Sequence, residues 1–314
     1  MTNLPITTSA WEVDETPSAD SSRFIPERRK RSPARWFAEV GWRHLVGILA
    51  VVFAVFPLLY VISVSLNPLG TLTGSNELFR AFDIANYTKL FSNPDAPFAK
   101  WFVNTLVIGI VSGVGTVFLG ALAAYSFSRM RFTGRRVGLL TLLLVQMFPQ
   151  FLAVVAIFLL MVGIGDIFPA IGLGSQAGLI LIYLGGALGV NTFLMYGFFN
   201  TVPTSIDEAA KIDGASHARI FFTIILRLVT PIIAVVGLLS FISATGEFVI
   251  ASILLTNPDS QTVAVGLFTF ISQFQSKNWG VFAAGAVLSA IPVVTLFLFL
   301  QKYIVSGLTA GSVK

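Results

Sequence analysis

The sequence predicts an all-α, polytopic membrane protein with six transmembrane helices, and three observations support that fold class. Hydrophobic residues make up 55% of the 314 residues and charged residues only 11%, whereas a soluble domain carries roughly 25% charged residues. The apolar residues gather into long runs, each able to supply the ~20 residues that a helix needs to cross the hydrocarbon core. Lys and Arg concentrate in alternate connections between those runs.

The predicted spans account for most of the chain and leave no room for a large additional domain. In order, they are residues 45–66, 102–127, 137–163, 177–199, 229–255 and 280–303. The first four are uncharged, the fifth holds a single charge, Glu247, and the sixth has Lys302 near its end. The third span contains Pro149, which removes a backbone hydrogen bond and predicts a kink; a pathway role for this segment and its amides, Gln146 and Gln150, is the alternative.

Two patterns suggest how these spans pack and where they end. Small residues at helical spacing let helices approach closely in lipid. They recur at Gly109-x-x-x-Gly113 and at Gly185-x-x-x-Gly189. An amphipathic indole ring prefers the membrane–water interface. Tryptophans lie at or just outside span edges at Trp42, Trp101 and Trp279.

The distribution of basic residues predicts the orientation. Of the 20 Lys and Arg residues, 16 lie in the N-terminal segment, the second and fourth connections and the C-terminal segment. Cytoplasmic segments are the ones rich in Lys and Arg, so both termini are expected in the cytoplasm of a multi-pass protein of the cell (inner or plasma) membrane. The basic residues flank spans instead of forming one face, which argues against nucleic-acid binding.

The segments outside the spans divide into an extension, loops and a tail. Residues 1–41 are polar, with acidic residues followed by a basic cluster, and predict a disordered cytoplasmic extension ahead of a transmembrane domain at 42–314. The external connection at 67–100 is long enough for a short surface helix. A second external loop, at 256–279, contains an apolar stretch, and a cytoplasmic tail is expected at 304–314.

The fifth span carries polar side chains on one face. Ser240, Ser243 and Glu247 fall at i, i+3 and i+7, which places them on one side of a helix. A carboxylate at membrane depth costs roughly 2.5–3.5 kcal/mol on insertion scales, so Glu247 should face a partner or an aqueous cavity. We interpret this face as part of a translocation path or gate, and a buried structural hydrogen bond is the alternative.

The connection at residues 200–228 is the most informative. Ser205 and Glu208 fit a capping box, S-x-x-E, which predicts the start of a helix. Asp207 and Glu208 would sit in its first turn, where the helix dipole favours anions, and Gly214 permits a left-handed turn or a close approach at its end. Such a short helix could dock into a cleft of a cytoplasmic protein; a simple connecting helix is the alternative.

The same connection carries a specific motif. Glu208-Ala209-Ala210 is followed by Asp213-Gly214-Ala215 and, further on, by Pro231. This pattern resembles the EAA loop of ABC importer permeases of type I. Arg227 departs from the pattern, because the family often has a proline there. Other segments, within roughly residues 40–314, are similar to the smaller permease subunit of maltose/maltodextrin-type carbohydrate importers. They include residues 146–149, 183–186, 240–242, 249–255, 264–266 and 307–314.

The resemblance implies a role and a set of partners. The chain would be a permease subunit of a binding-protein-dependent sugar importer, with maltose or maltodextrin as cargo, and would form the translocation path with a second, homologous permease. Two ATPase subunits would bind ATP and Mg²⁺, so no cofactor and no enzyme activity is expected in this chain. An extracytoplasmic sugar-binding protein would dock on the other side, and the sugar would be held mainly by the other permease.

Three groups of site residues follow from the resemblance. ATPase coupling is expected at Glu208, Ala209, Ala210, Asp213, Gly214 and Ala215. Contact with the sugar-binding protein is expected at Gln273, Gln275 and Lys277. The tail would reach the ATPase interface through Gly307, Leu308, Thr309 and Gly311.

Other functions are disfavoured by what the sequence lacks. There is no cysteine and there are only two histidines, so thiolate chemistry and a histidine-rich metal site are excluded. No G-x-x-x-x-G-K-[ST] phosphate loop is present. A secondary transporter remains an alternative, although ion coupling favours paired charges within the membrane. An ABC permease for trehalose, another oligosaccharide or a polyol also remains open.

Overall fold

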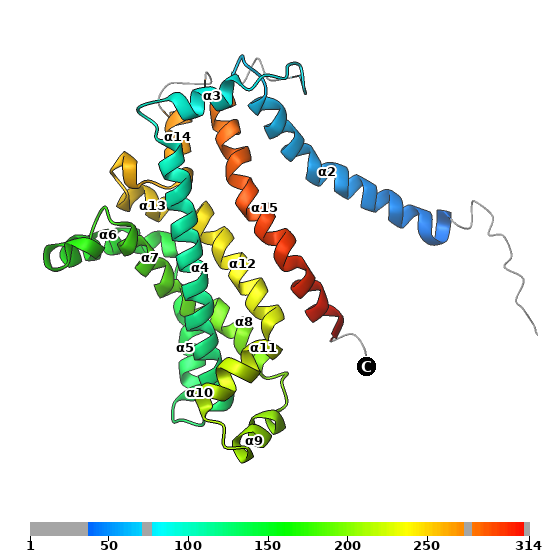
Figure 1. Ribbon diagram of the computed structural model, residues 1–314, viewed down its shortest axis with the longest axis vertical. Helices are drawn as coiled ribbons and strands as arrows, with labels where there is room; N and C mark the ends of the chain where they lie inside the picture. Colours follow the sequence, from blue (N-terminus) through cyan, green and yellow to red (C-terminus); the bar gives the residue numbers. More distant parts are fainter. Residues whose placement is uncertain (1–36, 71–76, 273–277, 311–314) are drawn as a thin grey trace, which may run out of the picture. The chain divides into compact units, whose positions relative to one another are not determined.

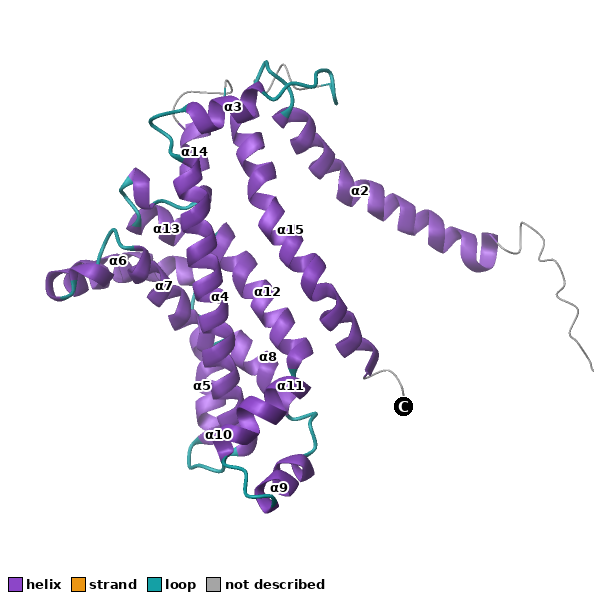
Figure 2. Cartoon of the chain, in the orientation of Figure 1, coloured by secondary structure: helices purple, strands orange, loops and turns teal. Residues whose placement is uncertain are grey.

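The structure is a computed structural model that describes residues 37–70, 77–272 and 278–310, and every regular element in these ranges is helical (Figures 1 and 2). The chain divides into two units, Met1–Ala54 and Val55–Lys314. Most of the predicted extension at 1–41 lies outside the described residues; its last residues form the π-helical turn η1 (Phe37–Gly41). Helix α2 (Trp42–Ser65) starts in the first unit, where Phe53 is 82% exposed.

The second unit continues with helices of very different lengths. In chain order they are α3 (Ala85–Ser92), α4 (Phe98–Arg129), α5 (Arg135–Gln146), α6 (Gln150–Ile167), α7 (Gln176–Gly185), α8 (Val190–Phe199), α9 (Thr204–Ile212), α10 (His217–Arg219), α11 (Leu226–Leu228), α12 (Thr230–Gly246), α13 (Val249–Leu254), α14 (Val263–Ser272) and α15 (Trp279–Ala310). Short 3-10 or π turns join several of them, namely η3 (Pro169–Ile171), η4 (Gly186–Leu188), η5 (Ile220–Ile225) and η6 (Pro258–Ser260).

Continuous and bent segments both satisfy the length and composition of a membrane span. Among the described residues, three single helices do so: Phe37–Ser65, Phe98–Arg129 and Trp279–Ile304. Three bent pairs do so together: Arg135–Gln146 with Phe151–Ile167, Gln176–Gly185 with Val190–Phe199, and His217–Leu228 with Thr230–Gly246. Counting each pair as one span gives up to six, so the six predicted spans agree with the structure only on that count.

The bends correct the expectation of unbroken helices in the fourth and fifth spans, and a proline lies at two of the three breaks. The kink predicted at Pro149 is confirmed, because α5 ends and α6 begins around it. Pro231 opens α12, and the pair of helices that meet there is bent by 81°, since proline cannot donate to the preceding turn. Glu247 then ends α12 instead of lying inside a longer helix.

Helix α4 runs through the centre of the second unit and packs on α12 (Figure 1). The predicted close approach at Gly109 is confirmed, because a Cβ there would lie 2.7 Å from Thr245 Cγ2. The approach predicted at Gly185 is not found among the described residues, where a Cβ would meet nothing within 4 Å. Gly189 instead packs against the side chain of Gln146.

The end of the unit where α4 begins differs from the expectation in two respects. Trp101 was expected at the membrane interface but is only 1% exposed, and its indole Nε1 donates to the Pro258 carbonyl at 2.7 Å. The apolar stretch of the loop 256–279 forms α14, which packs with Trp101 in one hydrophobic cluster. The short helix expected in 67–100 is confirmed as α3.

Candidate functional site

Helix α9 follows Pro203 and lies beyond the end of α4 (Figure 1). The predicted capping box is wrong. Pro203 occupies the cap position with an extended backbone, and no side chain among the described residues caps α9. Because the helix begins at Thr204, Ser205 is already its second residue, and a residue there cannot serve as the N-cap of a box with Glu208.

The C-terminal end of α9 confirms the turn predicted at Gly214. Gly214 has a φ of +78°, a left-handed conformation that glycine adopts without a Cβ penalty. Two backbone hydrogen bonds close the end, from Ala215 N to Ala210 O at 2.9 Å and from Gly214 N to Lys211 O at 3.0 Å. These are the two bonds of a Schellman motif, so the helix terminates sharply at a defined point.

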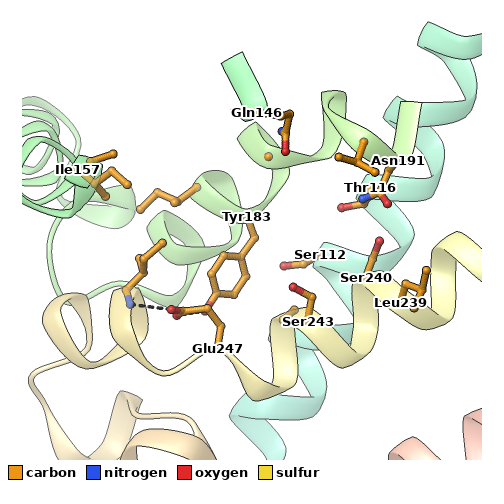
Figure 3. Close-up of a pocket in the computed structure, with 16 residues that line it drawn as sticks. Ser112, Thr116, Gln146, Ile157, Tyr183, Asn191, Leu239, Ser240, Ser243 and Glu247 are labelled. Atoms are coloured by element: carbon orange, nitrogen blue, oxygen red, sulfur yellow. Dashed lines mark hydrogen bonds between the residues drawn. The ribbon is translucent and has the colours of Figure 1, made fainter. Parts of the chain in front are cut away.

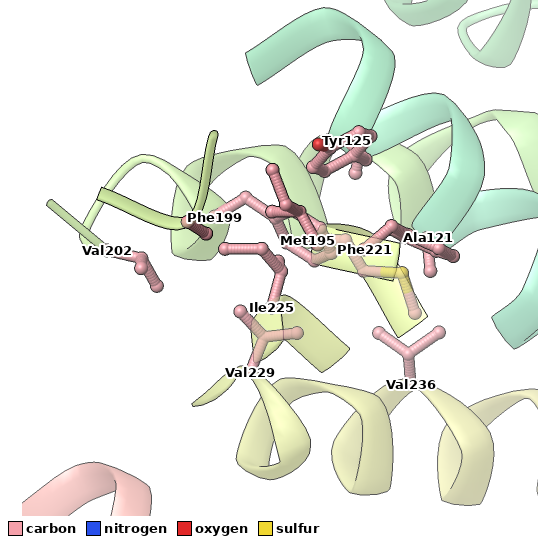
Figure 4. Packing of buried hydrophobic residues seen from close by; sticks show 12 residues of the cluster. Ala121, Tyr125, Met195, Phe199, Val202, Phe221, Ile225, Val229 and Val236 are labelled. Atoms are coloured by element: carbon pink, nitrogen blue, oxygen red, sulfur yellow. The ribbon is translucent and has the colours of Figure 1, made fainter. Parts of the chain in front are cut away.

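The two faces of α9 differ in accessibility. Glu208 and Ala209 are exposed, and Ile212, which the sequence reasoning did not single out, is 86% exposed. Ala210 is instead only 9% exposed and belongs to the hydrophobic cluster that contains Phe199 (Figure 4). Ala210 therefore anchors α9 within its own chain. On the opposite face, the exposed side chain of Ile212 lies one helical turn from Glu208 and is accessible to a protein partner.

A buried ion pair between α4 and the inner face of α9 was missed by the sequence reasoning. Arg129 Nε lies 2.8 Å from Asp207 Oδ2, and the two side chains are 6% and 7% exposed. Arg129 Nη2 also donates to the Val202 carbonyl at 2.8 Å. Asp207 was expected only to favour the helix dipole, because nothing local in the sequence indicates a partner so far back along the chain.

The predicted polar face of the fifth span lines a cavity of about 470 Å³. Ser240, Ser243 and Glu247 all border it, so the structure brings the three residues together as expected (Figure 3). The rest of the wall comes from α4, α5, α6 and the bent α7–α8 pair, and its polar members are Ser112, Thr116, Gln146, Tyr183 and Asn191. Gln146 belongs to the third span, whose amides were a candidate for the pathway, whereas the other four were not anticipated. The hydroxyls of Ser112 and Ser240 are buried and have no hydrogen-bond partner among the described residues.

Glu247 confirms the expected structural hydrogen bonds and borders a cavity, while its role in a path or gate stays a prediction. Its carboxylate borders the cavity, yet it also accepts three hydrogen bonds. Tyr183 Oη donates to Oε2 at 2.9 Å, and the backbone amides of Ile250 and Ala251 donate at 2.8 and 2.9 Å. The two amides belong to the first turn of α13, where a carboxylate is favoured by the helix dipole. Glu247 therefore stabilises the junction of α12 and α13 at the cavity wall.

The comparisons with known proteins identify the family. Residues 116–310 match the family described as binding-protein-dependent transport system inner membrane component. The chain belongs to this family of permeases. The galactooligosaccharides transport system permease protein GanQ of Bacillus subtilis (strain 168) is 41% identical over 271 residues, which are 86% of this chain and 93% of that protein.

Further relatives carry the maltodextrin resemblance. The maltodextrin transport system permease protein MdxG of Bacillus subtilis (strain 168) is 39% identical over 90% of this permease and 99% of its own length. The maltose/maltodextrin transport system permease protein MalG of Escherichia coli (strain K12) is 38% identical over 86% of this permease and 94% of its own length. These matches confirm the resemblance found in the sequence.

A solved structure shows the same fold. A bacterial ABC transporter involved in the import of the acidic polysaccharide alginate contains a chain with a TM-score of 0.72 to this permease at 24% identity. The match covers 87% of this permease and 98% of that chain.

The remaining predicted site residues of the permease are only partly visible. Gln273, Gln275 and Lys277 lie outside the described residues. Helix α15 continues to Ala310, so residues 307–309 of the predicted tail are helical, and Gly311 lies beyond the described part. No cluster of three or more His, Cys, Asp or Glu that could hold a metal occurs in the ranges that the structure describes.

Proposed function

We propose that this chain is a membrane-spanning subunit of an ATP-driven, binding-protein-dependent sugar importer. Maltodextrin-type oligosaccharides are the proposed cargo, since two of the relatives carry maltodextrin in their names. The permease would pair with a second, homologous permease and span the cell membrane six times with both termini in the cytoplasm. Two ATPase subunits would bind ATP and Mg²⁺, and an extracytoplasmic sugar-binding protein would deliver the cargo.

The shape of α9 is the observation that carries the proposal. The helix is held from behind by Asp207 and Ala210, while Glu208, Ala209 and Ile212 remain free on its outer face. A nine-residue helix is marginal in water by itself. The contacts of Asp207 and Ala210 stabilise its inner face, and the ATPase would stabilise its outer face. The outer face would enter a cleft of one ATPase subunit, with Glu208 near a basic group and Ile212 in an apolar contact.

The polar cavity would form this chain's part of the translocation path. Ser240, Ser243 and Glu247 border it together with the unpartnered hydroxyl of Ser112. A hydroxyl without a protein partner can bond to water or to a sugar hydroxyl without breaking an existing bond. The volume of the cavity, about 470 Å³, lies within the range of small-molecule sites, roughly 300–1,000 Å³.

The two remaining regions are assigned on the family resemblance. Residues Gln273, Gln275 and Lys277 would contact the sugar-binding protein, and Gly307, Leu308, Thr309 and Gly311 would reach the ATPase interface. Galactooligosaccharide is a second candidate cargo, because the relative GanQ is 41% identical to this chain.

Uptake by the complete importer tests the proposal. The four-subunit complex is reconstituted in vesicles with the cognate binding protein outside and ATP inside, and uptake of labelled maltotriose, galactooligosaccharide and trehalose is compared. Sugar uptake that requires ATP, and that stops when the ATPase subunits are inactivated, is the expected result. Uptake that persists with inactive ATPase would instead identify a secondary transporter, and a preference for galactooligosaccharide would replace the proposed cargo.

A further inference from the structure

The ion pair between Arg129 and Asp207 joins the last residue of α4 to the first half of α9, which lie 78 positions apart in the sequence. Its geometry is close, at 2.8 Å between Nε and Oδ2, and both side chains are more than nine-tenths buried. The guanidinium makes a second contact from Nη2 to the Val202 carbonyl, immediately before Pro203. Arg129 therefore contacts the Asp207 side chain of α9 and the backbone carbonyl of the segment that leads into α9.

A buried ion pair is a poor device for stability alone. Removing two charges from water costs several kcal/mol per ion, and a well-packed apolar pair is often as stable or more stable. The pair is also incompletely satisfied, because Arg129 Nε and both carboxylate oxygens of Asp207 are buried and make no hydrogen bond among the described residues. What Arg129 does supply is a defined position for α9, because its guanidinium faces Asp207 Oδ2 through Nε and donates to the Val202 carbonyl through Nη2.

Helix α4 connects the Arg129–Asp207 pair to the cavity. Helix α4 is continuous from Phe98 to Arg129, and it carries Ser112 and Thr116, which border the cavity. At 1.5 Å per residue, Ser112 lies about 25 Å along the helix from Arg129. A single α-helix moves over that distance as a nearly rigid rod, so displacement of its end displaces the cavity wall.

We propose that Arg129 is a positioning residue for coupling, and that the Arg129–Asp207 pair transmits movement of α9 to α4 and from there to the cavity wall. The inference rests on the proposed function, because it assumes that an ATPase moves α9. The pair lies on the inner face of α9 and leaves Glu208, Ala209 and Ile212 free. Loss of the pair should therefore loosen transmission while the docking surface persists.

The test measures sugar molecules transported per ATP hydrolysed by the reconstituted complex, together with the amount of ATPase that co-purifies. Arg129→Met and Asp207→Asn should each retain most of the ATPase and lower the sugar-to-ATP ratio at least tenfold. The double variant Arg129→Met/Asp207→Asn should be no worse than either single variant, because each loss removes the same interaction. Arg131→Met removes an exposed arginine nearby and should leave the ratio unchanged.

Several results would overturn the inference. A ratio within twofold of the unchanged complex in either single variant would show that the pair transmits nothing. Parallel loss of co-purified ATPase and uptake would reduce the pair to a structural role, and losses that multiply in the double variant would show two independent effects. ATP-dependent uptake by the unchanged complex tests the proposed function separately. Without such uptake, the proposed function and this inference both fail. If the unchanged complex transports sugar and the variants keep its sugar-to-ATP ratio, only this inference fails.

Discussion

Substitution of Gly214 by valine tests whether the shape of α9, and not only its sequence, is needed for ATPase docking. Gly214 has a φ of +78°, and a Cβ at this position would meet nothing within 4 Å among the described residues. The damage from a larger side chain would therefore come from the backbone conformation within this chain and not from a clash.

The magnitude follows from the cheaper of two alternatives. A left-handed conformation costs an L-residue roughly 1–2 kcal/mol, and the penalty is larger for a β-branched residue, which makes valine a true outlier there. If the turn opens, that strain is relieved, but the two Schellman bonds at Ala215 N and Gly214 N are lost at about 1 kcal/mol each. A cost of ~2 kcal/mol corresponds to roughly 30-fold in the population of correctly ended helix.

The assay is co-purification of the ATPase with the permease, measured together with sugar uptake and the amount of permease in the membrane. Gly214→Val should reach the membrane but retain little ATPase and transport little sugar. Gly214→Asn is the matched control, because asparagine has a similar size and tolerates the left-handed region. Equal loss in both variants would assign the effect to bulk at the docking surface, and normal behaviour of Gly214→Val would make α9 a simple connector.

Three further predictions address orientation, the cavity and the external loop. In this cysteine-free chain, a cysteine introduced at Ser276 should react with an impermeant thiol reagent in intact cells, and one introduced at Ser216 should not. The reverse pattern would contradict the predicted orientation. Glu247→Gln should assemble but transport about tenfold less, equivalent to ~1.4 kcal/mol for one weakened charge-assisted hydrogen bond, whereas normal uptake by Glu247→Ala would exclude a role at the gate. Shortening residues 273–277 should preserve basal ATP hydrolysis and lower its stimulation by sugar-loaded binding protein, and full stimulation would place that contact elsewhere.

The sequence predicted the features that depend on composition and local pattern. Apolar runs near 20 residues identified helices that could span a membrane, although three of the candidates proved to be bent pairs. Gly214 was expected to permit a left-handed turn because glycine commonly ends helices in that conformation, and its φ of +78° confirms the turn. The polar face of Ser240, Ser243 and Glu247 followed from helical spacing and does border a cavity.

The features that escaped prediction depend on tertiary packing. Arg129 reads as a topology-fixing charge beside a span, and only the fold brings it to Asp207. Trp101 reads as an interfacial residue, but α14 and η6 cover it. The capping box failed for a local reason that a pattern alone does not show: Pro203 can occupy the cap position itself, so the helix starts two residues too early for Ser205 to be the N-cap.

Photo-crosslinking from α9 tests the central claim, that the outer face of this helix docks into the ATPase. The chain has no cysteine, so a benzophenone can be attached at a single introduced residue. Ala209 is exposed on α9, and Ser92 is exposed on α3, at the opposite end of α4. In the assembled importer, the Ala209→Cys variant should crosslink to the ATPase and the Ser92→Cys variant should not. A transport-competent Ala209→Cys complex without a crosslink to the ATPase would contradict the account.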